Sequence, residues 1–134
     1  QFQSGDWTHV VLSGGGNDFL ESNCEVELDK LISPELDAGR MVDLISEFRR
    51  RGLKVIIVGY VNPQNPDGEA GSCRPLQTLL QRYRLLAAGI MDVSFVDGRQ
   101  VIQPNESQYY ADDIHTSVLG SRRVAEAIAQ RIAP

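Results

Sequence analysis

The chain has 134 residues, of which 42% are hydrophobic and 23% charged, and its formal net charge is −5. This size and composition are typical of one globular domain, residues 1–134, with a core of ordinary size. The acidic balance argues against nucleic-acid binding, and no apolar stretch approaches the ~20 residues of a membrane span.

The chain begins with neither a methionine nor a signal-peptide pattern, which is typical of a processed product or of one piece of a larger polypeptide. The first predicted element is a strand over Thr8–Ser13. A helix is then expected to begin with Ser33 as its N-cap and Pro34 at its first position, and to end at Gly52. Its predicted apolar face consists of Met41, Leu44, Ile45 and Phe48.

The second predicted strand, Leu53–Tyr60, has a continuous apolar centre, as expected for a strand covered on both faces. A loop rich in Pro, Gly and Asn, Val61–Pro75, leads to a second helix over Leu76–Ile90. The third strand is Val93–Val96, and the Asp-Gly pair after it leaves a hairpin open as an alternative. A last helix is expected over Ser117–Ile132, with a core face of Val124, Ala125, Ile128 and Ile132.

The alternation of strands and helices predicts an α/β fold, in which a parallel sheet carries helices on its faces. Three strands are few for an open parallel sheet, which indicates that the sheet is incomplete at its N-terminal end. Ligands bind beyond the carboxyl ends of the strands in such sheets. Three polar loops are expected there, namely Gly14–Asp18, Asn62–Arg74 and Asp112–His115.

The loop before the last helix contains an Asp and a His three residues apart, Asp112 and His115. A carboxylate that accepts a hydrogen bond from one imidazole nitrogen leaves the other nitrogen as a general base, which activation of a serine hydroxyl requires. By itself this spacing is a weak signal, because Asp-rich loops before helices are common. His9, the other histidine, lies at the start of a strand and is expected to be structural.

Three glycines, Gly14 to Gly16, follow the first strand and precede Asn17 and Asp18. A dinucleotide fingerprint would need glycine at position 19, which is Phe19, and a phosphate loop would need Lys and Ser or Thr after the last glycine. The glycines instead let a ligand or another backbone come close. The Asn17 side-chain NH₂ is suited to stabilise an oxyanion.

Together these two motifs resemble the SGNH/GDSL hydrolases. The stretch Gly15–Asp18 is similar to their G-x-N-D block, and Asp112–His115 to their D-x-x-H block near the C-terminus. The resemblance covers the chain as the later two-thirds of such a domain. It implies a flavodoxin-like, three-layer α/β/α sandwich whose N-terminal strands are missing from this chain.

The resemblance also implies an activity, the hydrolysis of esters without metal or cofactor. His115 would be the base, Asp112 its orienting carboxylate, and Asn17 and Gly15 the oxyanion-hole donors. Members of the family accept varied acyl esters, including lipids, thioesters and acetylated sugars, so the expected substrate is a small-molecule, lipid or acetylated-sugar ester.

The chain departs from the family at the nucleophile, which lies in a G-D-S block after the family's first strand. In Ser4–Trp7, the nearest string, Trp7 stands where the serine would be, while Ser13 lies within a strand and Ser117 starts a helix. The resemblance therefore implies that the nucleophile belongs to an N-terminal segment that is either missing or separate, with a second chain as one form of the latter. The alternative is a non-catalytic module of the same fold that binds a carbohydrate or an acyl group.

Cys24 and Cys73 match neither a metal motif nor a C-x-x-C pair. Each is expected in a loop that follows a strand, where a disulfide between them would indicate an exported protein, periplasmic or secreted. Two separate buried thiols are the alternative, and they leave a cytoplasmic location open.

Overall fold

The structure is a computed structural model that describes residues 5–16, 28–65, 67–68 and 73–132. Its elements in chain order are β1 (His9–Leu12), α2 (Leu28–Leu31), α3 (Arg40–Arg50), β2 (Lys54–Val58), α5 (Arg74–Gly89), β3 (Val93–Val96), α6 (Gly98–Val101) and α7 (Val118–Ile132). A 3₁₀ turn, Ser107–Tyr109, precedes α7. The described strands form one parallel sheet in the order β1-β2-β3.

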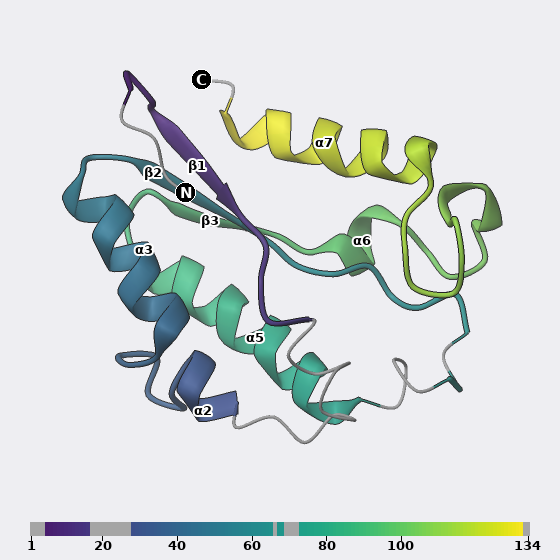
Figure 1. Cartoon of the computed structure of the whole chain (residues 1–134), viewed down its shortest axis with the longest axis horizontal. Coiled ribbons are helices and arrows are strands. Elements are labelled where there is room, and N and C mark those ends of the chain that lie inside the picture. The colour runs from purple at the N-terminus through teal and green to yellow at the C-terminus, as the bar shows by residue number, and fades with distance from the viewer. Residues whose placement is uncertain (1–4, 17–27, 66, 69–72, 133–134) are drawn as a thin grey trace.

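Helices cover both faces of this sheet, which confirms the predicted α/β sandwich. Figure 1 shows α3 and α5 on one face and α7 on the other. The larger core lies on the α3 and α5 side, where Val55 and Ile57 of β2 pack against both helices. The smaller core lies under α7, where Ile56, Val58 and Val96 meet Val124, Ala127 and Ile128. Because alternate residues of β2 enter different cores, its apolar run is continuous, as the sequence predicted.

The helix predicted to begin at Ser33 begins instead at Arg40. The Ser33 hydroxyl closes a local turn by accepting hydrogen bonds from the backbone N–H groups of Asp37 and Ala38, at 3.1 Å each. Leu36 and Gly39 both have positive φ, which interrupts any helix through this stretch. The predicted apolar face is wrong at one residue, because Leu44 is exposed and Val42 is buried instead.

The hairpin left open after β3 does not form, and a short helix, α6, takes its place. Asp97 is the N-cap of α6, and its carboxylate accepts a hydrogen bond from the backbone N–H of Arg99 at 3.2 Å. Gly98 lies so close to the end of β2 that a Cβ there would approach the Gly59 carbonyl oxygen to 2.6 Å. The glycine of the Asp-Gly pair therefore serves close packing rather than a hairpin turn.

Candidate active site

The loop before α7 brings Asp112 and His115 into direct contact. The Nδ1 atom of His115 lies 2.8 Å from Oδ2 of Asp112. In the neutral tautomer in which Nδ1 carries the proton, the ring donates this hydrogen bond and Nε2 is left as a proton acceptor. Both side chains are open to solvent in the chain, at 70% and 56% exposure respectively.

The backbone of the same loop fixes Asp112 in this orientation. Its Oδ1 atom accepts hydrogen bonds from the backbone N–H of Ile114 at 2.9 Å and of His115 at 2.7 Å. These two bonds, followed by the bond to the His115 ring, lower the pKa of Asp112 from 3.8 to about 2. The carboxylate is therefore charged at any pH at which a neutral imidazole could act as a base.

Neighbouring residues attach the loop to the rest of the fold. Tyr110 and Thr116 form an isolated antiparallel bridge, and the Tyr110 hydroxyl donates to the Asn62 carbonyl at 2.8 Å. Ser117 caps α7, since its hydroxyl accepts from the Gly120 N–H at 3.2 Å. The predicted start of this helix at Ser117 is confirmed to within one residue. The Asp-His pair is thus held between the end of β2 and the first turn of α7.

The glycine loop after β1 is tied down by two tyrosines. The Tyr83 hydroxyl donates to the Gly14 carbonyl at 3.2 Å, and the Gly16 N–H donates to the Tyr60 hydroxyl at 2.8 Å. Gly15 has a φ of +91°, and a Cβ at this position would lie 2.7 Å from a methyl carbon of Leu79. These contacts require the small residues that the sequence places here.

Tyr60 also joins the two motifs, a role that the sequence did not reveal. Besides accepting from Gly16, it lines a hollow of about 330 Å³ together with His115. The other lining residues come from the end of β2, the Asp-His loop and α7, and most are apolar: Gly59, Val61, Ile114, Thr116, Ser121, Val124, Ala125 and Ile128. An aromatic residue just past the buried apolar run of β2 was the available signal, because that position opens onto the ligand-binding edge of a parallel sheet.

Several predicted residues lie outside the described residues. Asn17, Asp18 and Cys24 fall in the stretch 17–27, so the oxyanion role of Asn17 and the pairing of Cys24 with Cys73 stay predictions. Cys73 is buried just before α5. The oxyanion role predicted for Gly15 likewise stays a prediction, while the N–H of Gly16 is engaged by Tyr60.

The described serines include one near the histidine, Ser121, which lines the same hollow. Its hydroxyl shares a 2.9 Å hydrogen bond with the hydroxyl of Thr116. Ser117 is engaged by the Gln108 carbonyl, to which its hydroxyl donates at 2.8 Å. In the part of the chain that the structure describes, no serine is hydrogen bonded to His115.

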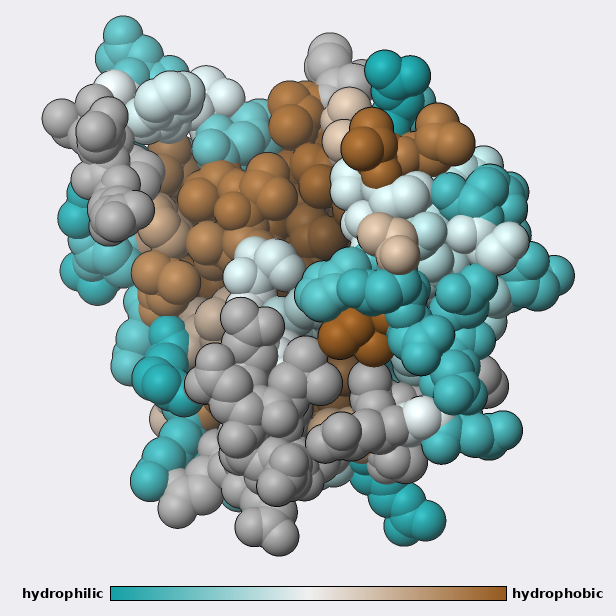
Figure 2. All heavy atoms as spheres, turned by 45° about the vertical axis from the view of Figure 1, so that its right-hand side comes forward, coloured by the Kyte–Doolittle hydropathy of each residue, from teal (hydrophilic) through white to brown (hydrophobic). Residues whose placement is uncertain are grey.

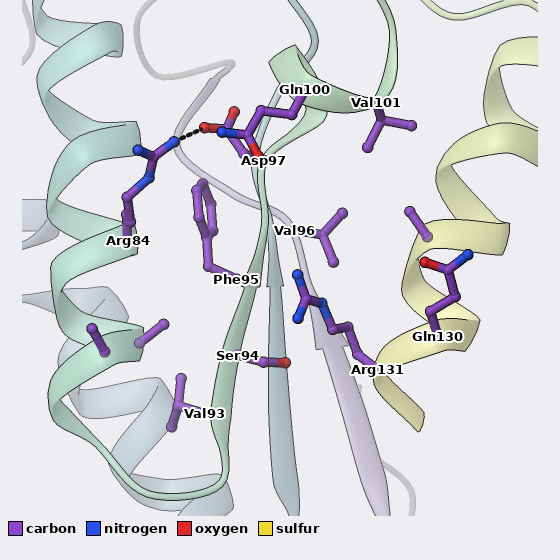
Figure 3. A pocket seen from close by; sticks show the side chains of 13 residues that line it. Arg84, Val93, Ser94, Phe95, Val96, Asp97, Gln100, Val101, Gln130 and Arg131 are labelled. Carbon is purple, nitrogen blue, oxygen red and sulfur yellow. Dashed lines mark hydrogen bonds and ion pairs between the residues drawn. The ribbon is translucent and has the colours of Figure 1, made fainter. Parts of the chain in front are cut away.

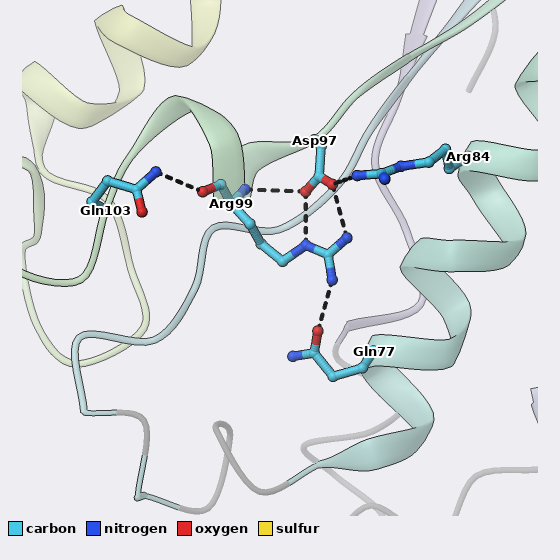
Figure 4. A network of polar contacts seen from close by, with 5 residues as sticks. All are labelled: Gln77, Arg84, Asp97, Arg99 and Gln103. Atoms are coloured by element: carbon cyan, nitrogen blue, oxygen red, sulfur yellow. Dashed lines mark hydrogen bonds and ion pairs between the residues drawn. The ribbon is translucent and has the colours of Figure 1, made fainter.

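A second hollow, of about 360 Å³, runs along β3 between α5 and α7 (Figure 3). Asp97 lies at its upper end in this view, and the buried carboxylate of Asp97 accepts a hydrogen bond from the Arg84 guanidinium at 2.5 Å. Arg99 adds two bonds to the same carboxylate at 2.8 Å each and donates to Gln77, as Figure 4 shows. Burial raises the pKa of Asp97, but the hydrogen bonds from Arg99 and Arg84 outweigh it, so the net pKa lies below its usual value.

This second cluster is structural in character, because every acceptor of the Asp97 carboxylate is already used by an arginine or by the backbone.

Among residues 5–16, 28–65, 67–68 and 73–132, no three His, Cys, Asp or Glu side chains are grouped as a metal site. The helices of these ranges are all too short or too polar to cross a bilayer. Of the arrangements described above, the Asp-His pair and the hollow beside it are the best suited to catalysis.

Comparison with known proteins bears on the fold of the chain. No family model and no curated protein matches the chain. A solved structure described as that of "a putative platelet activating factor" from Streptococcus pneumonia superposes with a TM-score of 0.70 at 20% sequence identity. The match covers 98% of this chain but only 63% of the other, so the chain spans less than two-thirds of that protein. At this identity the likeness shows a shared α/β fold.

Proposed function

We propose that the chain is part of a serine ester hydrolase and supplies its general base and the carboxylate that orients it. The observation that carries the proposal is the Asp112–His115 pair, with the Nδ1 atom held at 2.8 Å and the ring open to the hollow beside it. Its position past the carboxyl end of β2 is where ligands bind in parallel sheets. The description of the structural neighbour as a platelet activating factor is compatible with this proposal, and the motif resemblance supports it.

The chemistry follows from the free Nε2 atom of His115. It removes the proton of a serine hydroxyl while the serine oxygen attacks the ester carbonyl carbon, which forms a tetrahedral oxyanion. The proton then passes from Nε2 to the leaving alkoxide as the ester C–O bond breaks, leaving an acyl-serine. Water attacks this acyl group, gives its proton to Nε2, and the serine recovers that proton as the acid departs. Asp112 stabilises the imidazolium in both halves of the reaction.

The apolar lining of the hollow supports an acyl ester as substrate. Val61, Ile114 and Ile128 can cover a hydrocarbon group next to the His115 ring, whereas no charged side chain of the described residues lines this hollow. Expulsion of water by an acyl chain would strengthen the electrostatic contribution of the Asp-His pair. Asn17 and Gly15 remain the proposed donors to the oxyanion.

The nucleophile is proposed to come from a polypeptide segment outside the 134 residues. A fluorophosphonate probe tests this in protein isolated with its natural companions. We expect a labelled serine on a companion peptide, and loss of the label by at least about a hundredfold in His115→Ala, since removal of a triad member is severe. Ser121→Ala is the matched control and should label normally. Label on Ser121 itself, or unchanged labelling of His115→Ala, would refute the proposal.

A non-catalytic acyl-binding module is the second candidate, favoured by the apolar hollow and by the lack of a serine bonded to His115 among the described residues. It predicts saturable binding of an acylated ligand that survives His115→Ala, together with no fluorophosphonate label on any companion peptide. The same labelling experiment therefore separates the two functions.

A further inference from the structure

The Tyr60 hydroxyl has a proton for which the described residues provide no acceptor. Its oxygen accepts the backbone N–H of Gly16 at 2.8 Å, and this is its one hydrogen bond within residues 5–16, 28–65, 67–68 and 73–132. A phenol has a single proton to donate, and here its oxygen is already an acceptor. The proton is therefore directed away from the Gly16 N–H and can bind another acceptor.

The acceptor role of this hydroxyl is structural. Gly16 is buried, so its N–H needs a hydrogen-bond acceptor. A Cβ at Gly16 would lie 2.5 Å from the Cζ atom of Tyr60, so the glycine loop packs directly against the end of the phenol ring. The bond holds the loop in place, but it uses the oxygen of Tyr60 and leaves the proton without a role.

The other tyrosines of the chain differ from Tyr60 in the use or in the place of this proton. Tyr83 and Tyr110 each donate to a backbone carbonyl oxygen, at 3.2 Å and 2.8 Å. Tyr109 accepts a hydrogen bond from Arg123, as Tyr60 does from the backbone, but Tyr109 is not among the residues that line the hollow beside the Asp-His pair. In the part of the chain that the structure describes, Tyr60 is thus the tyrosine that can offer a proton to this hollow.

Tyr60 lies next to both halves of the candidate site. It lines the hollow together with His115, and Gly16, which its hydroxyl binds, directly precedes Asn17. Most residues along the hollow are apolar, and Figure 2 shows apolar residues gathered over a broad area of the face that it presents. Hydrogen bonds are stronger in such surroundings than in water. A proton donor at this place can therefore act on a ligand held in the hollow.

We propose that Tyr60 is a catalytic residue, which donates a hydrogen bond to the carbonyl oxygen of the bound ester. This role rests on the proposed function. When the serine oxygen forms its bond to the carbonyl carbon, the electron pair of the C=O π bond moves to the carbonyl oxygen, which becomes an oxyanion. Hydrogen bonds to charged acceptors are stronger than those to neutral ones, so Tyr60 stabilises the oxyanion more than the ester. Tyr60 keeps its proton throughout, and the Gly16 N–H makes the hydroxyl a stronger donor by polarising it.

Tyr60→Phe removes the donor and is assayed in protein isolated with its natural companions. With para-nitrophenyl acetate as the substrate, we expect kcat to fall about a hundredfold, as for the loss of one oxyanion donor, while KM changes by less than about threefold. The split is expected because the hydrogen bond strengthens in the transition state. Circular dichroism establishes that the variant is folded. An unchanged kcat in the folded variant would overturn the proposal.

A second variant separates the two roles of the hydroxyl, because Tyr60→Phe also removes the acceptor of the Gly16 N–H. Difluorotyrosine in place of Tyr60 keeps the ring and the hydroxyl, but its phenol loses the proton nearer to neutral pH. The phenolate still accepts from Gly16, whereas it cannot donate to an oxyanion and repels its charge. We expect kcat to fall as this phenol ionises, which its absorbance reports, over a pH range in which the wild-type kcat is constant. A kcat that stays constant through the ionisation would refute the donor role.

Tyr109 provides the matched control, since its hydroxyl accepts from Arg123 at 2.9 Å outside the hollow. Tyr109→Phe, and difluorotyrosine in place of Tyr109, should keep the wild-type kcat and pH profile. Equal losses in the Tyr60 and Tyr109 variants would contradict a role of Tyr60 at the ester. Along the hollow, His115 is the other titratable side chain of the described residues, and it is common to all these proteins.

His115→Ala distinguishes failure of this inference from failure of the proposed function. Hydrolysis that requires His115 but does not require the proton of Tyr60 refutes the role of Tyr60 alone. A wild-type protein that neither hydrolyses the ester nor carries a fluorophosphonate-labelled companion refutes the proposed function, and the role of Tyr60 with it.

Discussion

Asp112 shows how a single exposed carboxylate is fixed by its own loop. Two backbone N–H groups hold the carboxylate, and they are the largest causes of its lowered pKa, followed by the His115 ring. Because these backbone bonds do not depend on the ring, they keep the carboxylate in place while the ring gains and loses a proton. The folded pKa lies below the unfolded one, so the stabilisation by this carboxylate is complete above about pH 4. It is lost as the pH falls from there through about 2.

The Asp112 carboxyl group should therefore titrate with a midpoint of about 2 when its ¹³C signal is followed by NMR. In His115→Ala the midpoint should rise but remain below the ordinary 3.8, because both backbone donors persist in that variant. A wild-type midpoint at the ordinary value would show that the loop does not hold Asp112 in this way. A full return to 3.8 in the variant would show that the ring, not the backbone, sets the pKa.

At the scale of elements, Asp97 joins β3, α5 and α6 through one buried carboxylate. We expect Asp97→Asn to lower the free energy of unfolding by about 3 kcal/mol, since it removes the partner of two arginines at a site that is 5% exposed. Arg84→Gln should cost less than about 1 kcal/mol, because the Arg84 side chain is 52% exposed and Arg99 remains. Urea unfolding at pH 7 measures both.

The pH dependence of these two variants provides the check. The pKa of Asp97 is lowered on folding, so its contribution is present above its unfolded pKa and is lost as the pH falls below it. The difference between wild type and Asp97→Asn should accordingly shrink in acid. Equal destabilisation by Asp97→Asn and Arg84→Gln, or a difference that does not change with pH, would contradict the network.

Elements with strong local signals were predictable from the sequence. β2 and α7 were found because a buried β-branched run and a serine-capped amphipathic stretch are favoured by the same local and tertiary forces. The predicted start of α3 was too early in the chain, because Ser33 and Pro34 suit a helix start and a tight turn equally well. The structure settles the choice, because Leu36 and Gly39 have positive φ angles, which interrupt a helix.

The Asp-His pair was likewise predictable, because its contact lies within four consecutive residues. The role of Tyr60 was not, since its hydrogen bond to Gly16 joins residues 44 positions apart that meet only after the sheet has formed. The hollow along β3 also required the fold, because Arg84 and Arg131 line it from different helices. Long-range contacts thus set the limit of the sequence analysis.

At the scale of the whole molecule, the sheet sets where chemistry can occur. The glycine loop and Tyr60 follow the carboxyl ends of β1 and β2, and the Asp-His loop lines the same hollow as Tyr60. The core under α7 is smaller than the core under α3 and α5. A covalent cross-link between distant loops would add to the stability of a fold built on these two cores.

The predicted Cys24–Cys73 disulfide would provide that cross-link and would support the proposed export of the protein. Closing a loop of roughly fifty residues stabilises a fold by about 4 kcal/mol in the chain-entropy model, so reductant should lower the free energy of unfolding by about that amount. Cys24→Ser should show the same loss without reductant and no further loss with it. Intact mass should be lower by two hydrogens in the oxidised protein. Titration of two free thiols in chain unfolded without reductant would show that the cysteines are separate.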